Sequence, residues 1–181
     1  MTEKPGTIGD PDIYLGGKLR KVTLDNSVWT WEMSPSKYIQ DAARNAEEYL
    51  EKNFGGRKLP KKASAPWPPN YVAELDSTPE LTTEHASYYQ LAIGVLHWAV
   101  ELGRVDIITE VSVLASQMAQ PREGHLDAVF HVFGYLKIKH NSQQVYDPTY
   151  PDIDMSNFIQ TDWESIYGDV KEAIPLEKPE P

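Results

Sequence analysis

The spacing of apolar and polar residues predicts β-structure at the start of the chain and helices after it. Residues 13–15, 19–24 and 28–33 are short runs with the alternation and the β-branched or aromatic residues typical of strands. Polar turn residues at 25–27 join the two longer runs. We therefore predict a β-hairpin, with 13–15 leading into it.

Helical spacing of apolar residues begins after the hairpin. Ser34 is a good N-cap, and Pro35 suits the first helical position. Apolar positions between 39 and 50 then repeat with the period of a helix, which Gly55-Gly56 ends. The hairpin and this helix are predicted to form one unit over residues 1–56.

Residues 57–82 differ in composition from the segments on either side. Their prolines are at positions 60, 66, 68, 69 and 79. Proline opposes a regular helix, and a connection of this length is uncommon inside a compact domain. The sequence therefore predicts an extended linker between the hairpin unit and a helical unit.

The helical unit is predicted for residues 83–141. Its expected helices are 84–102, capped by Thr82 or Thr83 and ended by Gly103, then 106–119, and a third that begins at Pro121. Short connections between amphipathic helices favour a small three-helix bundle. Arg104 and Asp106, between the first two helices, are interpreted as structural residues of that connection.

Residues 142–181 are predicted to be mostly irregular. A short strand is expected at 144–146, followed by an acidic tail that contains several prolines and ends in a disordered segment over 175–181. Strands at the start and helices after them place the chain in the α+β class.

Charge is distributed unevenly along the 181 residues. The net charge is −10, made of +2 over residues 1–62 and −12 over residues 63–181. This acidity argues against a general nucleic-acid-binding protein. Two local basic clusters, at 18–21 and 57–62, are interpreted either as phosphate contacts or as ordinary solvated surface.

Composition also restricts the location and the chemistry. The chain has no cysteine, so disulfides and thiolate metal sites are excluded. No apolar run approaches the roughly 20 residues of a membrane span, and the first residues lack the apolar core of a secretory signal. We predict an intracellular, cytoplasmic protein without a membrane partner.

The most informative feature is a glycine in the middle of the helix expected at 84–102. Gly94 costs that helix about 1 kcal/mol relative to alanine. Gln90, Gly94 and Trp98 are four residues apart and share one face. One interpretation is that a neighbouring helix packs against Gly94. The other is that this face lies along a nucleic-acid minor groove, which is only about 6 Å wide.

The same helix resembles part of a known family. Residues 90–99, QLAIGVLHWA, are similar to the first thumb helix of retroviral reverse transcriptases. A wider set resembles copia-type retrotransposon reverse transcriptases more specifically: 93–96, 103–107, 111–114, Pro121, His125 and 135–137. Residues 12–19, DIYLGGKL, resemble the hairpin that grips the primer end in this family.

This resemblance implies binding roles for eight residues. By analogy, Gln90, Gly94 and Trp98 would follow the minor groove of the template–primer duplex. The remaining residues would contact the primer's sugar–phosphate end or nearby phosphates: Tyr14, Leu15, Gly16, Lys18 and Arg20. The RNA/DNA template–primer duplex is the partner that follows.

The catalytic part of the family's pattern is expected outside this chain. The parent enzyme makes DNA on an RNA template and holds two magnesium ions between clustered aspartates. This sequence contains no Asp-Asp pair. We therefore expect no catalytic residue, metal ligand or cofactor here, and an inactive fragment of a polyprotein. Its partners would include the missing palm, fingers and ribonuclease H segments, in the virus-like particle of the parent element.

Two alternatives use the same sequence features. The chain could be a non-enzymatic remnant whose helical bundle binds protein through the Gly94 face, which the acidic second half favours. It could also be a decayed reading frame without a stable fold, because a hairpin needs a further surface to pack against.

Overall fold

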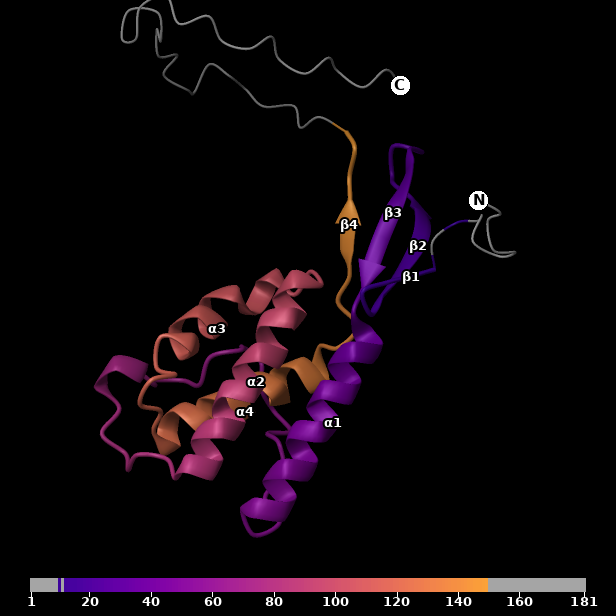
Figure 1. Ribbon diagram of the computed structural model, residues 1–181. Coiled ribbons are helices and arrows are strands. Elements are labelled where there is room, and N and C mark those ends of the chain that lie inside the picture. The colour runs from indigo at the N-terminus through magenta and orange to yellow at the C-terminus, as the bar shows by residue number, and fades with distance from the viewer. Residues whose placement is uncertain (1–9, 11, 150–181) are drawn as a thin grey trace, which may run out of the picture. The chain divides into compact units, whose positions relative to one another are not determined.

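The computed structural model describes Asp10 and residues 12–149, and it shows an α+β fold, as predicted (Figure 1). The predicted disordered segment and most of the acidic tail lie outside the described residues. The strands are β1 (Ile13–Tyr14), β2 (Gly17–Thr23), β3 (Trp29–Ser34) and β4 (Gln144–Tyr146). The helices are α1 (Ser36–Asn53), α2 (Thr83–Glu101), α3 (Ile108–Ala115) and α4 (Glu123–Ile138), with short 3-10 turns at Ala73–Leu75 and Val105–Ile107.

The strands form one antiparallel sheet in the order β1-β2-β3-β4. The predicted hairpin of β2 and β3 is confirmed, and it runs from the Lys18–Ser34 pair to the Thr23–Trp29 pair. In its turn, Asn26 Oδ1 accepts a hydrogen bond of 3.0 Å from the Val28 amide, as expected for a polar turn residue. The strand predicted at 144–146 is also present, and it pairs with β3.

The N-terminus of α1 differs from the prediction. Ser34 is the last residue of β3, and Pro35 occupies the N-cap position without a side-chain cap. The reason is strand pairing: Ser34 lies opposite Lys18 and stays extended, while its hydroxyl donates to the Ser142 carbonyl at 3.4 Å. The prediction of Thr82 as a cap of α2 is confirmed, since its Oγ1 accepts from the His85 amide.

Residues 57–82 are a packed segment and do not behave as a free linker. Their prolines do prevent regular α-helix, but Leu59, Ala63 and Ala73 are buried. Pro60 lies so close to α4 that a Cβ built on Gly134 would be 2.9 Å from Pro60 Cδ. The segment therefore covers α4 with its own apolar side chains.

All four helices share one hydrophobic core. Ile39 and Leu50 of α1 belong to the same buried cluster as Leu96 of α2, Leu114 of α3 and Phe133 of α4. The described residues up to Pro148 form one compact unit, so they do not divide at 57–82 as predicted. The helical body has four helices where three were expected, because α1 packs on α4 across the intervening segment.

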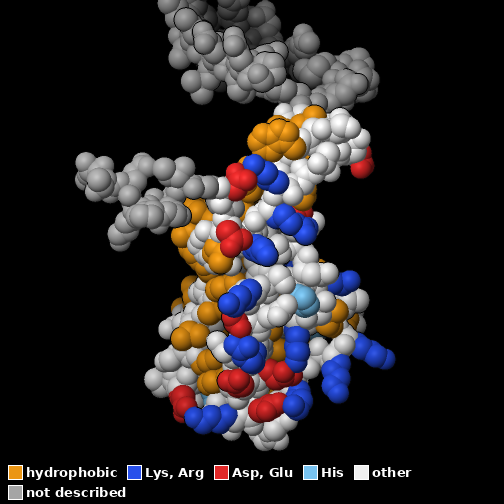
Figure 2. Space-filling model, turned by 90° about the vertical axis from the view of Figure 1, so that its right-hand side faces the viewer, with side chains coloured by type: hydrophobic (Ala, Val, Ile, Leu, Met, Phe, Trp, Pro, Cys, Tyr) orange, Lys and Arg blue, Asp and Glu red, His pale blue; other side chains and the backbone are white. Residues whose placement is uncertain are grey.

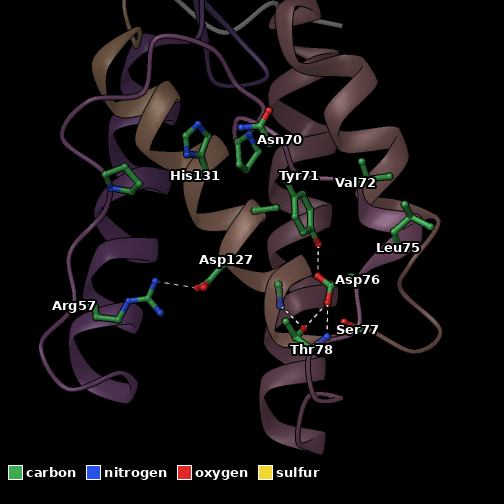
Figure 3. A pocket seen from close by; sticks show the side chains of 14 residues that line it. Arg57, Asn70, Tyr71, Val72, Leu75, Asp76, Ser77, Thr78, Asp127 and His131 are labelled. Carbon is green, nitrogen blue, oxygen red and sulfur yellow. Dashed lines mark hydrogen bonds and ion pairs between the residues drawn. The ribbon is translucent and has the colours of Figure 1, made fainter.

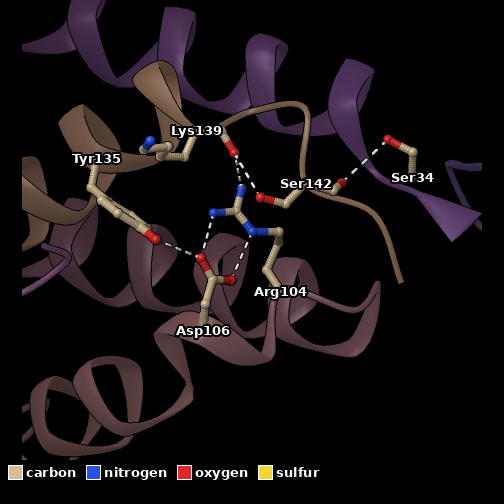
Figure 4. A network of polar contacts seen from close by, with 6 residues as sticks. All are labelled: Ser34, Arg104, Asp106, Tyr135, Lys139 and Ser142. Carbon is tan, nitrogen blue, oxygen red and sulfur yellow. Dashed lines mark hydrogen bonds and ion pairs between the residues drawn. The ribbon is translucent and has the colours of Figure 1, made fainter. Parts of the chain in front are cut away.

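A buried arginine joins the end of α2 to the end of α4 (Figure 4). Arg104 is almost completely buried, and its Nε and one terminal nitrogen donate to the two carboxylate oxygens of Asp106 at 2.8 and 2.7 Å. Its other terminal nitrogen donates to the Lys139 carbonyl at 2.9 Å, and the Tyr135 hydroxyl donates to Asp106 at 2.9 Å. These contacts give both residues a structural role.

Candidate nucleic-acid interface

The α2 strip, which we define as Gln90, Gly94 and Trp98, is open to solvent. Trp98 is 40% exposed, and a Cβ built on Gly94 would meet no atom of the described residues within 4 Å. The side-chain amide of Gln90 reaches the Met118 carbonyl at 3.3 Å and is otherwise exposed. The interpretation that a neighbouring helix packs against Gly94 is therefore wrong.

The opposite face of α2 holds the strip in place. Ala92, Ile93, Leu96 and Ala99 are buried in the core, so the helix cannot turn the strip inward without exposing them. The Tyr38 hydroxyl of α1 also donates to the Val95 carbonyl at 2.9 Å. The strip is a surface on a rigid element, which is favourable for shape-dependent binding.

The side chains beside the strip are uncharged over more than two helical turns. Leu91 is 62% exposed, and His97 is also exposed. From Ser87 to Trp98 the helix carries no Lys, Arg, Asp or Glu. The strip therefore offers an amide, bare backbone, a ring and apolar surface, while any ionic contact with phosphates must come from other elements.

The predicted primer-gripping residues lie at the sharp turn between β1 and β2. Leu15 and Gly16 have φ of +51° and +95°, in the left-handed region that only glycine adopts without cost. Tyr14 and Leu15 are exposed, and within the part of the chain that the structure describes no atom lies within 4 Å of a Cβ built on Gly16. The turn therefore presents two apolar side chains and an unobstructed backbone position to solvent.

Lys18 and Arg20 share one face of β2 but differ in their partners. The Arg20 guanidinium is bound to the carboxylate of Glu32, which lies opposite it on β3 and is only 3% exposed. The charge of Arg20 is therefore largely neutralised within the sheet. Lys18 is exposed, and it lines a hollow together with Lys37 and Gln40 at the start of α1.

The second basic cluster is also partly neutralised. Arg57 is 3.0 Å from Asp127, and Lys58 is 2.5 Å from Glu51. Figure 2 shows the side of the molecule that includes α1 and the sheet, and Lys and Arg side chains there are interspersed with Asp and Glu. This side of the molecule is therefore not a continuous basic surface.

The structure does not join the predicted site residues into one cluster. Among Asp10 and residues 12–149, no hydrogen bond, ion pair or ring contact connects the α2 strip with Tyr14, Leu15, Gly16 or Lys18. The strip lies on the helical body, whereas the other residues lie on the sheet (Figure 1). They are two separate surfaces.

A groove of about 660 Å³ between the 57–82 segment and α4 was not predicted from the sequence (Figure 3). In it, Asp76 accepts hydrogen bonds from the Tyr71 hydroxyl at 2.6 Å and from the Thr78 amide at 2.8 Å. The Thr78 hydroxyl in turn accepts from the Gly124 amide at 2.9 Å. The polar side chains of this groove thus fasten the segment to the first turn of α4.

These contacts also shift the pKa values of the Asp76 carboxyl group and the Tyr71 hydroxyl. Burial alone would raise the pKa of Asp76, but the hydrogen bonds from Thr78 and Tyr71 outweigh it, so that pKa is lowered. Burial and the bond to Asp76 raise the pKa of Tyr71. Asp76 is therefore a carboxylate with bound partners, which suits a structural role better than proton transfer. The residues involved are far apart in the sequence and form no local motif.

No group of three or more His, Asp or Glu side chains in the described part of the chain could hold a metal ion. None of the helices in that part is both long and apolar enough to cross a lipid bilayer. No protein-family model, curated protein or solved structure matches the chain.

Proposed function

We propose that the chain is a fragment of a copia-type retrotransposon polyprotein, from the reverse transcriptase region, and that the α2 strip binds a template–primer duplex. The observation that supports this most is Gly94. Glycine there destabilises the helix by about 1 kcal/mol, and no side chain among Asp10 and residues 12–149 occupies the space beside it. Close approach of a ligand to the helix backbone would explain why glycine occupies position 94 despite this cost.

The minor groove of a duplex fits the chemistry of the strip. A whole helix is about 10–12 Å wide with its side chains and cannot enter a groove about 6 Å wide. At Gly94, however, one groove edge can approach the backbone. Gln90 can hydrogen-bond to base-edge acceptors that are nearly the same for every sequence, and the Trp98 ring can lie against a sugar. Binding that ignores sequence is what a polymerase thumb requires.

The charges predict a binding mode with few ionic contacts. The strip has no charged side chain, and Arg20 is occupied by Glu32, which leaves Lys18 as the cation of the primer-gripping residues. Each phosphate contact contributes about 0.9 to the slope of log K against log salt concentration. With Lys18 supplying this contact, we expect a shallow slope of about 1 in magnitude.

We propose a binding role and no chemical step for this chain. In this proposal, the magnesium-dependent chemistry of the parent enzyme resides in the palm and ribonuclease H segments of the polyprotein. Those segments and the fingers are its proposed protein partners, with the virus-like particle in the cytoplasm as the setting.

Fluorescence anisotropy with a labelled, blunt-ended RNA/DNA hybrid tests the proposal. Gly94→Leu fills the open position and is expected to weaken binding about tenfold or more. Trp98→Ala is expected to weaken it about fivefold to tenfold, which corresponds to about 1 kcal/mol. Leu75→Ala is the matched control, because Leu75 is an exposed apolar residue outside α2 and should have no effect. Circular dichroism verifies that each variant is folded.

Failure of the wild-type chain to bind the hybrid would contradict the proposal. So would binding that neither α2 variant changes. The second candidate function, a non-enzymatic protein-interaction module, is favoured by the exposure of Leu91 beside the strip. In that case the α2 variants would leave hybrid binding unchanged and would reduce co-elution with the remaining polyprotein segments.

A further inference from the structure

One face of the sheet carries exposed aromatic side chains. Successive residues of a strand point to opposite faces, and the register places Lys21, Trp29, Trp31 and Tyr146 on the same face. We call these four residues the aromatic face. Trp29 is 63% exposed, Tyr146 is 43% exposed and Trp31 is partly exposed.

Backbone pairing holds the three rings at defined positions. Trp31 lies between Lys21 on β2 and Tyr146 on β4. Trp29 is two residues along β3, so its Cα is about 6.7 Å from that of Trp31. The Thr30 hydroxyl, which points to the other face, donates to the Tyr146 carbonyl and fastens β4 to the sheet. The rings are thus arranged on rigid strands before any ligand binds.

The rings are not part of the hydrophobic core, and the Lys21 ammonium lies over one face of Trp29 and one face of Trp31. None of the three belongs to the buried cluster or to the side chains packed against it. Lys21 Nζ is 5.4 Å from the ring centroid of Trp29 and 5.3 Å from that of Trp31. The residues of β2, β3 and β4 contribute no Asp or Glu to this face, although Asp10 reaches Lys21 Nζ at 2.8 Å.

We propose that the aromatic face binds single-stranded nucleic acid by stacking two or three unpaired bases on Tyr146 and on the faces of Trp29 and Trp31 that Lys21 does not cover. Flat rings offer π-faces to bases of any sequence, and each such stack contributes about 1–3 kcal/mol. Lys21 lies beside the path of the phosphates between stacked bases, and its ion pair with Asp10 is exposed on both sides and therefore weak, so a phosphate can replace the Asp10 carboxylate. A duplex is excluded because its base faces are already stacked on one another. The aromatic face shares no residue with the α2 strip, and its proposed ligand is single-stranded and not a duplex. This inference therefore does not depend on the proposed function.

The test uses a labelled oligothymidylate of about twelve nucleotides, long enough to cover one sheet face. Anisotropy and tryptophan quenching measure its binding to the full chain. Trp29→Ala is expected to weaken binding about fivefold or more, and Tyr146→Ala similarly, which corresponds to at least 1 kcal/mol. Trp29→Phe keeps a ring and should retain most of the affinity. Lys21→Gln should reduce the salt slope by about 0.7.

Trp98→Ala is the matched control, because it removes an exposed tryptophan from α2. It should leave oligothymidylate binding unchanged, while Trp29→Ala should leave blunt hybrid binding unchanged. Absence of binding by the wild-type chain, or equal losses for Trp29→Ala and Trp98→Ala, would overturn the inference. So would a Trp29→Ala variant that binds the oligonucleotide normally and loses self-association in light scattering, because the face would then be a protein interface.

Discussion

Two glycines in the middle of helices should respond in opposite directions to the same substitution. Gly94 in α2 and Gly134 in α4 are both helical, so replacement by alanine improves the helix propensity of each by about 1 kcal/mol. Their surroundings differ. At Gly94 the new methyl group would meet none of the described atoms within 4 Å, whereas at Gly134 it would lie 2.9 Å from Pro60 Cδ and 3.1 Å from the Pro60 carbonyl oxygen.

The magnitudes follow from these distances. Gly94→Ala gains the propensity term alone and should raise the free energy of unfolding by about 1 kcal/mol. Gly134→Ala gains the same term but must push a proline ring and a backbone carbonyl, and overpacking of this kind costs about 1–3 kcal/mol. We therefore expect a net loss of about 1 kcal/mol. The two variants should differ by about 2 kcal/mol, or roughly 4–8 °C in Tm for a chain of this size.

Urea unfolding followed by circular dichroism measures both values under one set of conditions. A destabilising Gly94→Ala would refute the reasoning, because it would mean that the open position is filled or strained in the folded protein. A stabilising Gly134→Ala would show that the 57–82 segment can move away from α4 at little cost in free energy. Hybrid binding by the stabilised Gly94→Ala variant adds a functional comparison: weaker binding with higher stability separates a ligand requirement from a folding requirement.

Three further predictions concern the connections between helices. Arg104→Met should lower the free energy of unfolding by about 3 kcal/mol in urea titrations, the low end for a broken buried pair because Asp106 is partly exposed. Burial alone would raise the pKa of Asp106, but Arg104 and Tyr135 outweigh it and lower that pKa. The resulting stability is present above the ordinary pKa of about 4 and is lost as pH falls through the lower folded value, so Asp106→Asn should flatten the acid limb of a stability–pH profile. Thr82→Ala should cost about 1 kcal/mol in thermal unfolding, since it removes the cap of α2.

Local signals accounted for the elements that the sequence predicted correctly. The turn at 25–27 has polar residues that bond to their own backbone, as Asn26 does, and Thr82 caps the helix that follows it. These hydrogen bonds join residues that are two or three positions apart, so tertiary contacts do not change which residues form them. The cap of α1 was misplaced because the pairing of Ser34 with Lys18 extends β3 by one residue, and no local pattern indicates where strand pairing stops.

The 57–82 segment shows that residue patterns within a segment do not predict its tertiary contacts. Proline correctly excluded regular helix there, but a segment without helix can still be buried. Leu59 and Ala73 are buried, and the segment contacts α4 through residues that are more than fifty positions away, such as His125 at the Ala73 carbonyl and Gly134 beside Pro60. The division into separate units failed for this reason, since only tertiary contacts show that α1 and α4 share a core.

The candidate sites were predictable to different degrees. The spacing of Gln90, Gly94 and Trp98 identified one helix face, but only the structure decides that Gly94 is open. The neutralisation of Arg20 depends on its register with Glu32, and the aromatic face needs Tyr146 beside Trp31. Both are pairings between strands, and the second joins residues from opposite ends of the described chain.

Because β4 comes from that distant part of the chain, the sheet cannot be completed early during synthesis. Its partner edge on β3 is made roughly 110 residues before β4 leaves the ribosome. At translation rates of about 5–20 residues per second, that edge stays unpaired for about 5–20 s. During this interval the nascent hairpin offers an open strand edge and two tryptophans to other chains, so chaperone capture or mispairing is expected there first.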